Sequence, residues 1–294
     1  AAGQDLDALV AVAGRPGFRP VPLGLSASAH LDNAIRRQSS RNVVGLLPGA
    51  MRPEEYVLFT AHWDHLGRCT PDATGDDICN GALDNATGTA GLVALADAFA
   101  RAGAPERSLV FLAVTGEESG LLGSAYYAAN PIYPLAQTVG GINMDGLNIV
   151  GATRDVVVVG GGKSELEDYL GVAARAQARV IRPEPMPQNG YYYRSDHFSL
   201  ARVGVPMLYA ESGHDLVEGG PAAGRVAAED YTANRYHAPS DEFDPGWDWA
   251  GAVQDLQLYY MIGRMLAVGD DWPKWRPDAE FRAAREASRP AGGQ

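Results

Sequence analysis

Short β-prone runs alternate along this chain with longer amphipathic stretches, and that alternation limits the folds open to it. A helical stretch between two strands lets the strands lie parallel while the helix packs on one face of the sheet. The pattern therefore predicts an α/β fold with a central, mostly parallel, mixed β-sheet flanked by helices. The predicted strands are residues 42–47, 56–61, 108–115, 138–144, 155–160 and 206–210, and the predicted helices are residues 88–102, 120–129, 163–179 and 248–267.

The composition supports a well-packed domain and excludes two classes of partner. The 294 residues are 46% hydrophobic, and the formal net charge is −12. A charge of that sign argues against nucleic acid as the main partner. No stretch approaches 18 uninterrupted apolar residues, so we expect no membrane span. We expect a main domain at residues 41–270, preceded by a less regular segment, 1–40, and followed by a polar tail, 271–294, that wraps or frays.

Metal-competent side chains follow several of the predicted strands. His62 ends the second strand, Glu117 and Glu118 follow the third, and Asp145 follows the fourth. Asp84 lies in the loop before the first long helix. Sites in open α/β sheets form outside the carboxyl ends of the strands, so these side chains are expected to meet. Imidazole and carboxylate together favour zinc, whereas an all-oxygen set favours calcium or magnesium.

A late histidine, His237, completes a set of five candidate ligands with His62, Asp84, Glu118 and Asp145. One bridging carboxylate and two further ligands for each metal would serve two zinc ions. The adjacent glutamates also suggest a division of labour. A metal would neutralise one carboxylate and leave the other free to accept a proton from water. Alone, such a glutamate pair would more simply be a solvated turn.

Six segments in this order resemble a known family, the di-zinc aminopeptidases related to bacterial leucyl aminopeptidase in clan MH. The resemblance covers roughly residues 42–265, and it implies a zinc-exopeptidase fold. The segments are "AHWDH", "DNATGTAG", "GEESGLLGS", "NMDG", "SDHFSL" and "YHAPSDE".

The resemblance also implies a role for individual side chains. It places His62 and Asp145 on one zinc, Glu118 and His237 on the other, and Asp84 between the two metals. In the catalytic machinery it makes Glu117 the general base, Asp64 the carboxylate that orients the first histidine, and Tyr236 a donor to the oxyanion. Tyr236 could instead be a half-buried packing residue.

Neighbouring residues of these motifs receive supporting roles. We expect His65 to buttress its loop and Asp196 with His197 to support the site from outside. The tyrosines at 191–193 either line a substrate pocket or pack at its rim. The first 40 residues are similar to the segment that follows a protease-associated domain in some relatives.

The only two cysteines, Cys69 and Cys79, lie in one polar loop. They form either a local disulfide or two free thiols. A disulfide would fit an oxidising compartment, so we expect a secreted or periplasmic protein.

The expected activity is metal-dependent exopeptidase cleavage, with a peptide carrying a free N-terminus as the substrate. A cationic α-amine needs carboxylates close by, and Glu117 and Asp145 would supply them. A carboxypeptidase or dipeptidase would instead need a fixed cation, and Arg194 and Arg202 keep that alternative open. A non-catalytic binding protein fits the sequence less well, because none of the five candidate ligands is missing.

Overall fold

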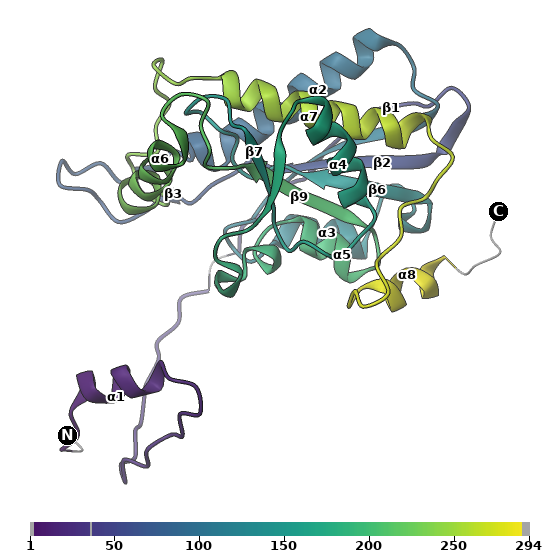
Figure 1. The fold of residues 1–294 in the computed structure, drawn as a ribbon. Helices are drawn as coiled ribbons and strands as arrows, with labels where there is room; N and C mark the ends of the chain where they lie inside the picture. The colour runs from purple at the N-terminus through teal and green to yellow at the C-terminus, as the bar shows by residue number, and fades with distance from the viewer. Residues whose placement is uncertain (1–2, 36, 290–294) are drawn as a thin grey trace. The chain divides into compact units, whose positions relative to one another are not determined.

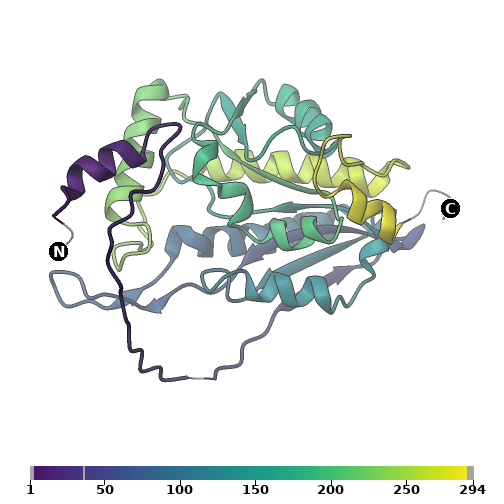
Figure 2. The ribbon, with the colours of Figure 1, turned by 90° about the horizontal axis from the view of Figure 1, so that it is seen from below.

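The structure, a computed structural model, describes residues 3–35 and 37–289 (Figures 1 and 2). Its contacts divide the chain into two units, residues 1–39 and residues 40–294. In the first unit, helix α1 (Leu6–Ala13) is capped by the Asp5 carboxylate, which accepts a hydrogen bond from the Ala8 N–H. None of the α1 residues is buried.

The described residues of the second unit form a seven-stranded mixed sheet in the order β1-β5-β2-β6-β9-β7-β8. The central strands β5, β2, β6 and β9 are parallel, whereas β1 and β7 run antiparallel to their neighbours β5 and β9. This is the predicted fold class, and β8 is a strand that the sequence pattern did not predict. The strands are β1 (Val43–Leu47), β2 (Arg52–His62), β5 (Arg107–Val114), β6 (Thr138–Asn143), β7 (Asp155–Val158), β8 (Val180–Pro183) and β9 (Met207–Ser212).

Helices cover both faces of the sheet (Figure 1). One face carries α2 (Gly88–Ala102), α4 (Leu166–Ala176) and α7 (Ala250–Val268), and the other carries α3 (Leu122–Ala129) and α5 (His197–Arg202). The second half of β2 is mostly apolar and buried on both faces of the sheet. Phe59 packs in the α2–α7 core and Leu58 in the α3–α5 core. Gly263 lets α7 come close, since a Cβ there would lie 2.5 Å from the Phe59 ring.

The sequence pattern did not predict helix α6 (Gly220–Asn234). Gly224 is its only buried residue, so the helix lacks the apolar stripe from which helices are recognised. Within the second unit, the C-terminal segment packs on the rest of the unit through the buried side chains of Trp275 and Phe281. Helix α8 (Arg282–Ser288) follows, and Arg285 donates a hydrogen bond to the Thr138 carbonyl. Residues 290–294 of the predicted tail lie outside the described residues. No helix in the described ranges is long and apolar enough to cross a membrane.

A short hairpin of β3 (Gly67–Arg68) and β4 (Ile78–Cys79) projects between β2 and α2. Cys69 and Cys79 are joined by a disulfide at its base, with Cα atoms 5.9 Å apart. Of the two alternatives that the sequence left open, the structure has the disulfide.

The disulfide should be detectable and stabilising. Intact-mass measurement of the native protein without reduction should give a chain lighter by two hydrogens than the reduced chain. Closing a loop of this length is worth about 2.8 kcal/mol in the chain-entropy model, so the Cys69→Ser/Cys79→Ser double variant should unfold at lower urea concentration. Two alkylatable thiols in the native protein would contradict the pairing.

Candidate metal centre

The predicted ligands gather where three neighbouring parallel strands, β5, β2 and β6, end at the same edge of the sheet. His62 is the last residue of β2. The chain turns at Gly116 after β5, with φ of +69°, and presents Glu117 and Glu118. Asp145 follows the end of β6 by two residues. From β2 the chain continues to β5 on one side, and from β5 it crosses to β6 on the other, so the site forms where the direction of connection reverses.

The loop that carries Asp84 is tied to the end of β6 by its neighbour Asn85. The Asn85 amide donates to the Met144 carbonyl at 3.0 Å, and its side-chain oxygen accepts from the Gly146 and Gly88 N–H groups, each at 2.9 Å. Asn85 is buried, so this three-way link replaces solvent as the partner of these peptide groups. The first turn of α2 and the loop after β6 are thereby held together.

Asp241 also holds this loop in place. Its carboxylate accepts hydrogen bonds from the N–H groups of Leu83 at 3.0 Å and Asp84 at 3.2 Å, and its carbonyl accepts one from Ala82. Asp241 is buried and lies four residues after His237. The sequence motif contained this aspartate, but nothing in the pattern showed that it fixes the backbone of Asp84.

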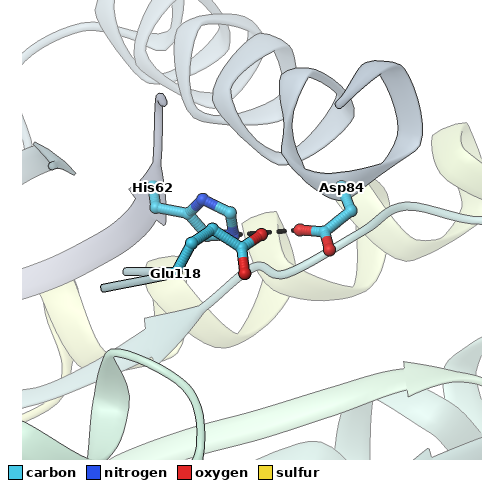
Figure 3. A group of neighbouring side chains, drawn as sticks. All are labelled: His62, Asp84 and Glu118. Atoms are coloured by element: carbon cyan, nitrogen blue, oxygen red, sulfur yellow. Dashed lines mark ion pairs between the residues drawn. The ribbon is translucent and has the colours of Figure 1, made fainter. Parts of the chain in front are cut away.

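The five predicted ligands form two histidine–carboxylate groups that share Asp84. His62 Nε2 lies 3.1 Å from Asp145 Oδ1 and 3.2 Å from Asp84 Oδ1. On the other side, His237 Nε2 lies 3.4 Å from Asp84 Oδ2 and 3.1 Å from Glu118 Oε2. Figure 3 shows Asp84 facing His62, with Glu118 beside them. Each oxygen of Asp84 thus faces a different histidine.

The donor set fits divalent metal ions. Ligand atoms of His62, Asp84 and Glu118 all lie within 4.8 Å of one another, a spacing that ligands of one ion can have. Among the described residues, buried His237 Nε2 and Glu118 Oε1 have no hydrogen-bond partner. Burial opposes protonation of His62, but Asp145 and Asp84 outweigh it and raise its pKa to about 12. The cluster therefore stabilises positive charge. Its mixed nitrogen and oxygen donors suit zinc.

Glu117 lies beside this cluster in a different electrostatic environment from Glu118. Burial, followed by the charge of Asp145, raises the pKa of Glu117 to about 9. Cations at the neighbouring ligands would lower it again, because they favour the carboxylate form. A carboxylate whose affinity for a proton is set in this way can act as a base.

Asp64 orients His62 through a different atom from the one that was predicted. The Asp64 backbone carbonyl accepts the hydrogen bond of His62 Nδ1 at 2.9 Å, which leaves Nε2 free to face the cluster. The Asp64 carboxylate instead accepts from the Gly116 N–H at 2.8 Å and from the Thr115 hydroxyl at 2.5 Å. Asp64 therefore links the end of β2 to the turn that presents the two glutamates.

The Tyr236 ring stacks on His237, with 3.8 Å between the ring centroids. Its side chain is 40% exposed, so it is a wall of the centre rather than a core residue. Burial of its inner part, followed by the charge of Asp84, raises its pKa, so the phenol keeps its proton and can donate it in a hydrogen bond.

A buried chain of hydrogen bonds fixes Asp145. The Ser195 hydroxyl donates to Asp145 Oδ2 at 2.5 Å, the Asn143 amide donates to the Ser195 hydroxyl, and the Thr60 hydroxyl donates to the Asn143 oxygen. The sequence reasoning missed this chain. The only hint in the sequence was that Ser195 begins the "SDHFSL" segment.

The two residues after Ser195, Asp196 and His197, are both buried. His197 is fully buried against the ring of Tyr192, at 4.6 Å between centroids, and burial lowers its pKa to about 3. It is thus a neutral packing residue. Tyr192 is buried, whereas Tyr191 and Tyr193 are exposed, so the tyrosine run divides between packing and surface.

A mixed α/β sheet with a shared-aspartate histidine–carboxylate cluster at its carboxyl edge places the protein in the metallopeptidase class. The chain belongs to Peptidase family M28, whose family model matches residues 42–261.

Individual relatives agree with this assignment over part of their length. The chain is 30% identical to the aminopeptidase NAALADL1 of Mus musculus over 139 residues, which is 44% of this chain and 17% of that protein. It is 35% identical to a probable zinc metalloprotease of Leptosphaeria maculans over 112 residues, which is 38% of this chain and 25% of the relative. The structure of BSAP, a zinc aminopeptidase from Bacillus subtilis, superposes with a TM-score of 0.57 at 19% identity, covering 82% of this chain and 52% of that one. The matches thus span about half or less of each relative.

Proposed function

We propose that this protein is an aminopeptidase that uses two zinc ions to release N-terminal residues from peptides. The observation that carries the proposal is Asp84, whose two oxygens face His62 and His237 separately. With Asp145 and Glu118 on the outer sides, each ion would have one histidine, one carboxylate of its own and a share of Asp84. Two such groups beside Glu117 supply the parts that hydrolysis through an activated water requires.

The residues of the chain divide the chemistry among them. When bound, a zinc pair polarises the scissile carbonyl and makes water more acidic. Glu117 accepts the proton of the attacking water and returns it to the leaving amine. Tyr236, protonated and beside His237, donates a hydrogen bond to the oxyanion. The Asp64 carbonyl, Asp241 and Ser195 keep the ligands in place.

The charge around the centre supports attack at the amino end. Beyond the five ligands, Glu117 contributes a further carboxylate close to Asp145, and burial followed by the charge of Asp145 raises its pKa. A substrate α-amine is largely cationic near neutral pH, so it would be bound by these carboxylates.

Arg194 supports a second candidate, a dipeptidase or carboxypeptidase. Its positive charge acts against the raised pKa values of Tyr236 and His237, and its guanidinium lies over the ring of Tyr191 at the protein surface. Arg202, the other arginine of this segment, lies over the ring of Phe198 instead. Of the two arginines, Arg194 is the one whose charge acts on residues of the centre, so it is the better candidate for binding a substrate carboxylate.

The direction of attack can be tested with blocked and free substrates. The zinc-loaded protein should cleave leucine p-nitroanilide, and N-acetylation should reduce cleavage by at least ~100-fold, because the site would lose the amine that it binds. Arg194→Ala should keep this activity, with Arg202→Ala as its matched control. Trimming of N-acetylated peptides from the carboxyl end, lost in Arg194→Ala alone, would instead establish the second candidate.

We also propose that the protein works in an oxidising compartment, as a secreted or periplasmic enzyme. The Cys69–Cys79 disulfide supports this, since such bonds persist mainly outside the reducing cytosol. Fractionation of the native host with an antibody to this chain would test it, and recovery in the cytosolic fraction would contradict it.

A further inference from the structure

His65 contacts the metal centre itself, rather than only supporting its own loop. Its side chain is 5% exposed, and its Nδ1 lies 2.8 Å from Glu118 Oε1. The other oxygen of Glu118, Oε2, lies 3.1 Å from His237 Nε2. The two oxygens of Glu118 are therefore divided between two histidines, and only one of them faces the groups that would hold a zinc ion.

The ring of His65 is fixed in this position by the end of the hairpin. It packs so closely on Gly81 that a Cβ at that glycine would lie 2.4 Å from His65 Cγ. Gly81 also has φ of +64°, which other residues rarely adopt. On its other side, His65 meets the edge of the His237 ring, with 5.4 Å between centroids. The imidazole cannot turn away from Glu118 without moving these neighbours.

His65 and Glu118 face one another at hydrogen-bonding distance in a buried setting. Within the described part of the chain, neither ring nitrogen of His65 nor Oε1 of Glu118 makes an aligned hydrogen bond, although Nδ1 and Oε1 are only 2.8 Å apart. A small rotation of the Glu118 carboxylate would align the two atoms. A buried carboxylate oxygen without a partner is costly, and a ligating carboxylate with a free oxygen can rotate away from its metal. A donor at Oε1 removes both problems.

We propose that His65 is a positioning residue for the metal centre, with its Nδ1–H donating to Glu118 Oε1 so that Oε2 remains the ligand atom on the His237 side. The inference rests on the metal centre of the proposed function, although not on the substrate. Hydrogen bonds that hold ligands in this way typically contribute 10–100-fold to metal affinity. Because Asp145 and His62 lie on the other side of Asp84, the effect should be confined to one of the two ions.

Two substitutions separate a hydrogen bond from packing. His65→Leu fills similar space without a donor, whereas His65→Asn places an amide N–H close to where Nδ1 lies. Zinc can be titrated into the metal-free protein in a calorimeter, with a competing chelator present. In His65→Leu, the affinity for one zinc equivalent should fall ~10–100-fold. The other equivalent should be unchanged, and His65→Asn should bind both nearly as the unaltered protein does. His30→Leu, the same change at a histidine that is 88% exposed, is the control.

The alternatives give different results. Unchanged affinity for both equivalents in His65→Leu would overturn the inference, and so would an equal loss in the leucine and asparagine variants, which would indicate packing. The visible spectrum of the cobalt-loaded His65→Asn variant should match that of the unaltered protein, and a change in its intensity would instead make His65 a ligand. If the unaltered protein binds no zinc, the proposed function fails. If it binds zinc without cleaving peptides, only the activity fails, and the role of His65 stands.

Discussion

Asp84→Asn is expected to lower the affinity for both zinc ions together and to abolish peptide hydrolysis. The substitution keeps the shape of the side chain but removes the negative charge that two cations would share. Loss of a hydrogen bond to a ligand already costs 10–100-fold in metal affinity, so loss of a shared ligand charge should cost at least ~100-fold. Elemental analysis after gel filtration should find well under one zinc per chain.

This result follows from the way in which Asp84 is held. Asp241 fixes its backbone N–H, and the next residue, Asn85, is fixed by hydrogen bonds to Met144 and Gly146. The backbone that carries the carboxylate therefore cannot shift toward one histidine. The histidines lower the pKa of Asp84 well below its usual range despite its burial, which shows how strongly the surroundings favour its charged form. An amide at this position leaves His62 and His237 without the charge that links them.

A matched surface change separates this effect from a general loss of stability. Asp97 pairs with Arg101 on the exposed side of α2, so Asp97→Asn makes the same chemical change away from the centre. Its zinc content and activity should equal those of the unaltered protein. Two tightly bound zinc ions in Asp84→Asn would rule out the bridging role, and loss of a single ion would mean that Asp84 serves one metal only.

The sequence predicted the sheet and the gathering of the ligands because both depend on local patterns. A buried strand such as β2 is recognisable from its apolar run, and parallel strands must end at one edge, so residues just after β2, β5 and β6 meet. Helix α6 lacked such a pattern because its side chains mostly face solvent. Strand β8 is a short edge strand with few buried side chains, and it is equally hard to recognise.

The supporting contacts of the centre could not be predicted, because they depend on which side chains meet in three dimensions. Asp241 reaches Asp84 across 157 positions, and Ser195 reaches Asp145 across 50. Spacing in the "HWDH" segment likewise could not show that Asp64 orients His62 with its carbonyl. Nor could it show that the second histidine of the segment reaches Glu118. Such contacts are set by the packing of loops, which leaves little periodic signal.

Glu117→Gln is expected to leave both zinc ions in place while kcat falls. The glutamine has the shape of the glutamate but cannot accept the proton of the attacking water. Loss of a general base typically costs ~10²–10⁴-fold in rate. Asp84, Asp145 and Glu118 form ion pairs with His62 or His237, and Glu117 forms none with them in the described residues. Zinc affinity should therefore change little. Steady-state kinetics with leucine p-nitroanilide, together with zinc analysis of the same samples, measures both quantities.

The neighbouring glutamate provides the sharpest control for this prediction. Glu118→Gln makes the same change one residue further along, but it removes a carboxylate whose Oε2 lies 3.1 Å from His237 Nε2. Zinc content should therefore fall in Glu118→Gln and remain in Glu117→Gln, although both variants lose activity. The turn after β5 makes this split possible, because Glu118 contacts His237 whereas no ion pair joins Glu117 to either histidine in the described residues. If Glu117→Gln loses zinc and Glu118→Gln keeps it, the roles of base and ligand are exchanged.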